Sequence, residues 1–160
     1  MKIEKISDIY EVLKGYTRKK RLVVAFANDS HSIEAVYMAV KAGLVEGILV
    51  GDTETIQGVC KENGYDESCF KIVHEPNDVR GAETAVEMIR NGEADVIMKG
   101  LVSTDKYMRA ILNKERGLVA PNAILSHVVV MECSSYHKLL TVSDVAVIPC
   151  PDLNQKISMI

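Results

Sequence analysis

The sequence contains no tryptophan, and aromatic residues make up only 5 % of its 160 positions. It also has no excess of basic residues, because 19 Lys and Arg face 22 Asp and Glu and give a formal charge of −3. Without a basic footprint or an aromatic stacking platform, nucleic acid is not an expected partner. No apolar run exceeds six residues and no signal-peptide core follows Met1, so we expect no membrane association and a cytoplasmic location.

Several sequence signatures are also absent. The chain has no G-x-x-x-x-G-K-[ST] and no G-x-G-x-x-G, so neither a Walker loop nor a dinucleotide fingerprint is present. Its four histidines show no helical metal spacing, and its cysteines form no C-x-x-C pair and no zinc pattern. We interpret the cysteines as reduced core residues. A nucleophilic Cys133 with His137 four residues later remains an alternative.

The hydrophobic pattern alternates between strands and helices. Continuous or nearly continuous apolar segments predict strands at residues 22–27, 46–50, 70–73 and 94–98. Helical periodicity predicts helices at residues 3–13, 30–42, 53–63, 79–90 and 103–117. This order predicts one α/β domain over residues 1–160, in which an open, mostly parallel sheet lies between helices on both faces, as a three-layer fold.

The last part of the chain has a different pattern. Residues 123–131, 138–142 and 145–148 are predicted strands, and their closeness favours hairpins or antiparallel pairs. Pro151 and Asp152 then predict a helix start, followed by an apolar stripe of Leu153, Ile157 and Ile160. We expect this stripe to pack against material outside these residues or against a second subunit, which favours a homo-oligomer.

Polar residues follow each predicted parallel strand, where ligands of open α/β sheets bind. The loops carry Asn28, Asp29, Ser30 and His31; Gly51, Asp52 and Thr53; His74, Glu75 and Asn77; and Lys99, Gly100, Ser103 and Thr104.

The last of these loops is the best candidate for an anion site. Gly100 allows close backbone approach, Ser103 and Thr104 offer hydroxyl and N–H groups at a helix start, and Lys99 and Arg109 add positive charge. Simple helix capping by the two hydroxyl residues, with solvated basic side chains, is the alternative interpretation.

The segment around this loop carries a family resemblance. Residues 98–118, Met-Lys-Gly-Leu-Val-Ser-Thr-Asp-Lys-Tyr-Met-Arg-Ala-Ile-Leu-Asn-Lys-Glu-Arg-Gly-Leu, resemble the phosphate acetyl/butyryltransferase family. Residues 125–128, 136–140 and 151–156 resemble segments of the same family, so the similarity extends over essentially the whole chain. It implies the isocitrate/isopropylmalate dehydrogenase-like fold of phosphotransacylases, in truncated form.

The resemblance also implies an activity. The family converts acyl-CoA and phosphate into acyl phosphate and coenzyme A, with coenzyme A as a substrate, no permanent cofactor and no metal. Ser103, Thr104 and the helix start suit the phosphate that this reaction must bind, and Arg109 matches a family arginine that holds phosphate or acyl phosphate. The family's aspartate base and its partner serine belong to a C-terminal half that has no counterpart here. We therefore expect a fragment with little turnover alone.

Two other functions compete with this interpretation. The chain could be a non-catalytic module that binds phosphate or coenzyme A. A phosphoacceptor receiver domain would have a similar alternation of strands and helices. That domain needs a carboxylate at the end of its third strand, where this chain has His74, Glu75 and Pro76.

Overall fold

The computed structural model describes residues 2–160, and the chain divides into two compact units. Thr17–Leu118 forms the first, which we call the sheet unit. The residues up to Tyr16, together with Val119–Ile160, form the second, which we call the hairpin unit. The assignment of residues 1–160 to a single domain stays a prediction.

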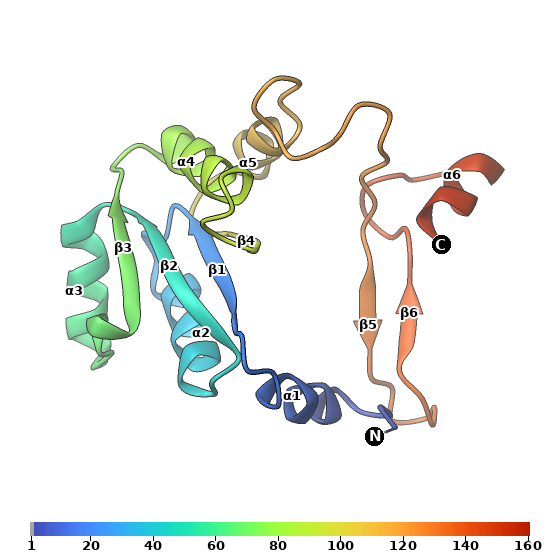
Figure 1. Ribbon diagram of the computed structural model, residues 1–160, viewed down its shortest axis with the longest axis horizontal. Coiled ribbons are helices and arrows are strands. Elements are labelled where there is room, and N and C mark those ends of the chain that lie inside the picture. The colour runs from blue at the N-terminus through green and yellow to red at the C-terminus, as the bar shows by residue number, and fades with distance from the viewer. Residues whose placement is uncertain (1) are drawn as a thin grey trace. The chain divides into compact units, whose positions relative to one another are not determined.

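The sheet unit contains a four-stranded sheet and four α-helices (Figure 1). Its elements are β1 (Lys20–Ala25), α2 (Ser30–Lys41), β2 (Val45–Gly51), α3 (Thr53–Asn63), a 3-10 turn at Glu67–Cys69, β3 (Phe70–His74), α4 (Asp78–Arg90), β4 (Val96–Lys99) and α5 (Thr104–Ile111). All strands are parallel, in the order β3-β2-β1-β4. The predicted α/β architecture with a mostly parallel sheet is thus confirmed.

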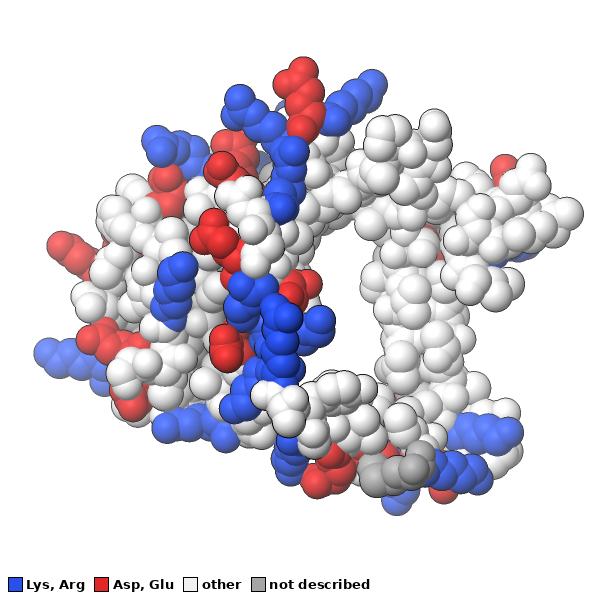
Figure 2. All heavy atoms as spheres, viewed as in Figure 1, with Lys and Arg blue, Asp and Glu red and all other residues white. Residues whose placement is uncertain are grey.

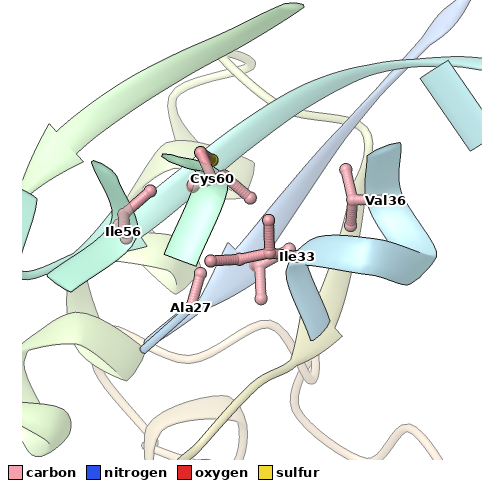
Figure 3. Close-up of a cluster of buried hydrophobic side chains, with 7 residues drawn as sticks. Ala27, Ile33, Val36, Ile56 and Cys60 are labelled. Atoms are coloured by element: carbon pink, nitrogen blue, oxygen red, sulfur yellow. The ribbon is translucent and has the colours of Figure 1, made fainter. Parts of the chain in front are cut away.

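One face of this sheet packs on α2 and α3. Val24 of β1 and Leu49 of β2 are fully buried against Ile33, Val36 and Ile56 from these helices. Figure 3 shows the helix side chains converging on the strands. Because this cluster holds large apolar side chains from four consecutive elements, it fixes the two helices on the sheet.

The other face packs on α4. Side chains alternate along a strand, so Val23 and Ile48 point away from the first cluster, and both are buried. The facing helix presents small residues, among them Ala82 and Ala85, which are fully buried. The sheet therefore has helices on both faces, as predicted.

The helix starts follow the capping chemistry of the sequence. The carboxylates of Asp29 and Asp52 accept from the N–H groups of Ser32 and Thr55, at 2.8 and 2.9 Å. The Asn77 side chain similarly caps α4. These caps lie at the carboxyl edge of the sheet, so they also shape the loops of the candidate site.

The hairpin unit contains α1 (Ile6–Lys14), β5 (Val129–Met131), β6 (Leu140–Val142) and α6 (Leu153–Met159). The two strands pair antiparallel, with Val130 opposite Thr141, which confirms the predicted antiparallel pairing. Asp152 caps α6 through the Gln155 N–H at 2.8 Å, as expected for its start. Among the described residues of this unit, none is buried.

The predicted strand at residues 145–148 is wrong. The Asp144 carboxylate accepts from the N–H groups of Ala146 and Val147 at 2.7 and 2.8 Å, and from that of His127 at 3.0 Å. Backbone donors that a strand would offer to a neighbour are thus bound to one side chain. Partial burial raises the pKa of Asp144, but these N–H donors lower it more and bring it to about 2.

The helix predicted to reach residue 117 also ends early, at Ile111. Asn113 is the cause, because its Oδ1 accepts from the N–H groups of Glu115 and Arg116 at 3.0 and 2.9 Å and folds the chain into a turn. Gly117 closes that turn, and a Cβ there would overlap the Ile111 and Asn113 carbonyl oxygens.

Candidate functional site

The predicted ligand loops do meet at one edge of the sheet. The register pairs Ala25 with Lys99 at the ends of β1 and β4, and Gly51 with His74 at the ends of β2 and β3. Backbone bonds continue past the strand ends, since the Glu75 N–H donates to the Gly51 carbonyl at 2.8 Å. The carboxyl ends of all four strands therefore form one continuous rim.

The β4–α5 junction is held directly against the end of β1. The N–H groups of Gly100 and Leu101 donate to the carbonyls of Ala25 and Phe26, at 3.0 and 2.8 Å. A Cβ on Gly100 would overlap the Phe26 carbonyl oxygen, so the close approach requires glycine. Phe26 itself has a φ of 63°, in the left-handed region that few side chains adopt.

This turn directs the chain into the amino terminus of α5. Ser103 is the N-cap, and its Oγ accepts from the Lys106 N–H at 3.3 Å. The first N–H groups of a helix have no partner within it, and the positive end of the helix dipole lies there. Ser103 and Thr104 are exposed, so both can offer hydroxyl and N–H groups to an anion.

Lys99 lies at the end of β4, and its ammonium contacts the Gly100 carbonyl at 3.4 Å. Lys99, Gly100, Ser103 and Thr104 thus belong to one continuous junction of six residues that also includes Leu101 and Val102. The lysine is exposed and forms no ion pair among residues 2–160.

Arg109 lies elsewhere on the same helix. Its guanidinium pairs with Asp105 at 3.0 Å across one helical turn, and both side chains are largely exposed. It lines a groove of about 1040 Å³ between α4 and α5, to which Lys99, Gly100, Ser103 and Thr104 do not contribute. Figure 2 shows basic and acidic side chains side by side over these two helices. The five sequence-predicted residues therefore fall into two groups, the junction and the groove.

Sequence reasoning missed one interaction beside the junction. The Lys106 ammonium lies 2.6 Å from the Asp78 carboxylate and joins the first turn of α5 to the first turn of α4. The hydrogen bond from Lys106 lowers the pKa of Asp78 below its ordinary value. The two residues are 28 positions apart, so no spacing rule indicates the pair.

The other three loops use their polar side chains within the fold. Asn28 Oδ1 accepts from the Asp52 N–H at 2.9 Å, and Thr53 Oγ1 lies 3.0 Å from His74 Nδ1. These contacts join loops that follow neighbouring strands. Polar residues predicted as ligand candidates thus also hold the rim together.

The glutamate of the third loop is one of only two buried polar side chains among the described residues. The Glu75 carboxylate accepts from the Asn77 N–H at 3.1 Å and pairs with Arg80 at 3.1 Å. It therefore stabilises the approach to α4.

The cysteine alternative gains no geometric partner. Cys133 Sγ lies 3.3 Å from Ser135 Oγ, and this hydrogen bond lowers the pKa of the thiol. His137 instead packs against Tyr136, with 4.9 Å between ring centroids. Among residues 2–160, no hydrogen bond joins the Cys133 thiol to the His137 ring.

Among residues 2–160, no group of three or more His, Cys, Asp or Glu side chains is placed to hold a metal ion. No helix in the same part of the chain has the length and apolar character needed to cross a membrane.

The fold and this junction define an α/β protein with a candidate anion site where a parallel strand leads into a helix. The model of the family "Phosphate acetyl/butaryl transferase" matches residues 70–160, which include that junction. The chain belongs to this family.

Curated relatives agree along nearly the whole chain. The phosphate butyryltransferase of Clostridium acetobutylicum is 40 % identical over 158 residues, which are 99 % of this chain and 52 % of the relative. The phosphate acetyltransferase of Thermotoga maritima is 34 % identical over 155 residues, or 97 % of this chain and 51 % of the relative. The chain thus spans about half the length of the curated relatives it matches.

Solved structures share the fold. A branched-chain phosphotransacylase from Enterococcus faecalis V583 superposes with a TM-score of 0.69 at 23 % identity, over 87 % of this chain and 48 % of that one. The EutD phosphotransacetylase from Staphylococcus aureus gives a TM-score of 0.73 at 14 % identity, over 96 % of this chain and 55 % of that one. At these identities, the comparison shows the fold alone.

Proposed function

We propose that the protein serves a phosphate acyltransferase reaction, in which acyl-CoA and phosphate give acyl phosphate and coenzyme A, with butyryl or a similar short acyl group. The β4–α5 junction carries this proposal. It combines a glycine that must lie against β1 with a helix start whose Ser103 and Thr104 are exposed to an incoming anion. Membership of the family and the names of the relatives support the reaction class.

The chemistry needs an oriented phosphate. One phosphate oxygen attacks the thioester carbonyl carbon, the carbon–sulfur bond breaks, and the coenzyme A thiolate leaves. The α5 N–H groups and the Ser103 and Thr104 hydroxyls would bind the remaining phosphate oxygens, while Lys99 would offset their charge. Such binding would fix the direction of attack, which is a large part of catalysis between two bound substrates.

Arg109 has a separate place in this proposal. It lies on the groove side of α5 and is held by Asp105 in the structure described. An exposed ion pair of this kind is weak, so phosphate or acyl phosphate can compete with Asp105 for the guanidinium. We assign Arg109 to phosphate or acyl phosphate on that basis, and no residue of this chain to deprotonation of the coenzyme A thiol.

The remaining properties follow the family. We propose coenzyme A as a substrate with no permanently bound cofactor, small molecules as the partners, a cytoplasmic location, and self-association into a homo-oligomer.

The first test is phosphate binding by the chain. Titration with inorganic phosphate should shift the backbone amide resonances of Ser103 and Thr104, and Ser103→Ala and Arg109→Ala should each weaken binding. The loss of a charge-assisted contact costs about 1.5–3 kcal/mol, or roughly ten- to a hundredfold in Kd. Lys61→Ala is a matched control, because this lysine lies in the last turn of α3, whereas the candidate site lies where helices begin. Unchanged phosphate affinity in both site variants would refute the assignment.

The second test is turnover. Purified chain is incubated with butyryl-CoA and phosphate, and free thiol is measured. We expect little turnover from these 160 residues alone and clear turnover when a C-terminal half from a relative is added in trans. Phosphate binding without turnover in either mixture would instead support a non-catalytic binding module.

A further inference from the structure

We infer that Lys106 and Asp78 are positioning residues, which set the orientation of the α5 amino terminus toward the phosphate. The inference rests on the proposed function of the β4–α5 junction. Neither residue belongs to the proposed phosphate ligands. Removing the Asp78 charge is expected to weaken phosphate binding, whereas a simple charge effect would strengthen it.

The pair joins the two helices at their first turns. Asp78 is the first residue of α4, and Lys106 is the third residue of α5. Their charged atoms lie 2.6 Å apart, and the side chains keep only 28 % and 43 % of their surfaces exposed. A partly shielded pair at this distance restrains its helices more than a fully exposed pair does.

The α4 side of the pair is fixed. Gly81, Ala82 and Ala85 bury the helix on the sheet, and a Cβ on Gly81 would lie 3.2 Å from the Phe26 ring. Asp78 therefore belongs to a helix that is held in place by its packing on the sheet. The short helix α5, of eight residues, is the part that the pair restrains.

The α5 side of the pair reaches the candidate site directly. The Lys106 backbone N–H is the group that Ser103 Oγ caps, at 3.3 Å. The next residue, Tyr107, donates its hydroxyl to the Ile97 carbonyl at 3.4 Å, and burial raises its pKa. A change in the position of Lys106 therefore changes the cap and the N–H groups that face the anion.

Lys106 lies at a position where helix electrostatics disfavour a cation. The positive end of the helix dipole is at the first turn, so an acidic residue is favourable there and a basic residue is unfavourable. Lys106 occupies this unfavourable position, yet its charge is directed to Asp78. Its value to the fold is thus the link to α4, and its ammonium is not free to bind phosphate.

The experiment compares two variants that remove opposite charges. Asp78→Asn removes a negative charge and releases Lys106, so a pure charge effect would strengthen phosphate binding. Positioning predicts the opposite result, a Kd for inorganic phosphate raised roughly three- to tenfold in both Asp78→Asn and Lys106→Met. The double variant should bind phosphate no worse than either single variant. Lys106→Arg, which keeps a positive charge at this position, should bind phosphate as well as the unaltered chain does. Lys71→Met is the matched control, because that lysine forms a looser ion pair with Glu93, at 3.9 Å.

Hydrogen exchange of the α5 amides provides a readout that does not depend on phosphate. We expect amide exchange to be at least threefold faster in Asp78→Asn and in Lys106→Met than in the unaltered chain, and to be unchanged in Lys106→Arg. Tighter phosphate binding by Asp78→Asn, or unchanged exchange in both variants, would overturn the inference. If the unaltered chain binds no phosphate, the proposed function fails, whereas the exchange result still decides whether the pair holds α5.

Discussion

Leu49 in the sheet unit is fully buried, whereas Val130 in the hairpin unit keeps 45 % of its surface exposed, although both are apolar residues within strands. The same contrast holds for whole units. Every buried residue among positions 2–160 lies between Val23 and Ile111, in the sheet unit. In Figure 2 the visible face of β5 and β6 is nearly free of Lys, Arg, Asp and Glu, and Val128 and Met131 are exposed there together with Val130.

The difference lies in what covers each strand. β1 lies between β2 and β4, its residues 22–24 pair with both strands, and helices pack on both faces of the sheet. Within the described part of the chain, β5 pairs only with β6, over three residues. A two-stranded hairpin buries too little apolar surface to be stable by itself in water. The site proposed here is therefore built on the well-packed unit, where a rigid frame can fix the position of an anion.

The largest expected effect tests this contrast in packing. Leu49→Ala should lower the free energy of unfolding by about 2–5 kcal/mol, because it leaves a cavity between the sheet and two helices. Val130→Ala should change it by less than about 0.5 kcal/mol, because that side chain is already partly in solvent. Urea titrations followed by circular dichroism measure both. Similar losses in the two variants would contradict the difference in burial.

A second comparison uses two glycines within the sheet unit. Gly100→Ala should destabilise the protein by about 1–3 kcal/mol and weaken phosphate binding, since the new Cβ would overlap the Phe26 carbonyl. Gly58→Ala should stabilise it by about 0.5–1 kcal/mol, because this glycine lies within α3 and a Cβ would meet nothing within 4 Å. Thermal unfolding measures the change in stability of both variants, and a phosphate titration measures the change in phosphate affinity. Equal stability of both variants would show that the junction does not need the close approach.

The sheet unit follows closely from local sequence. Continuous apolar segments locate its four strands to within about two residues, because strands covered on both faces need apolar residues at consecutive positions. The helix starts are equally readable, since the Asp29 and Asp52 carboxylates can reach N–H groups three residues later. The loop that carries Ser103 could thus be placed at the carboxyl edge from the sequence.

Interactions between distant residues could not be read in this way. No strand forms at residues 145–148 because the Asp144 carboxylate accepts hydrogen bonds from backbone N–H groups, both nearby at Ala146 and at the distant His127. In the site, spacing suggests the Asp105–Arg109 pair but gives no sign that Arg109 lies on the α4 side of α5. The Lys106–Asp78 pair is invisible for the same reason, because it depends on how two helices pack.

A smaller effect is expected from pH in the hairpin unit. The pKa of Asp144 is about 2 in the folded chain, against about 3.9 in an unfolded one, so its contribution to stability is complete above about pH 4. The contribution is lost as the pH falls through about 2, when protonation weakens the bonds to Ala146 and Val147. Amide chemical shifts of these two residues should report the transition. Asp144→Asn should abolish it, whereas a transition that persists in this variant would assign it to another group.

The smallest effects should come from the apolar stripe of α6. Leu153 and Ile157 keep 72 % and 63 % of their surfaces exposed, so at low protein concentration, where the chains are separate, Leu153→Ser and Ile157→Ser should each change the free energy of unfolding by less than about 0.5 kcal/mol. Ile56→Ser in α3 is the matched control and should cost several times more, because that side chain is fully buried. Urea titrations at two protein concentrations make the result specific. A loss in the α6 variants that grows with concentration would show that a second copy covers the stripe, whereas a large loss at both concentrations would show that the stripe is buried within one chain and would break the contrast between the two units.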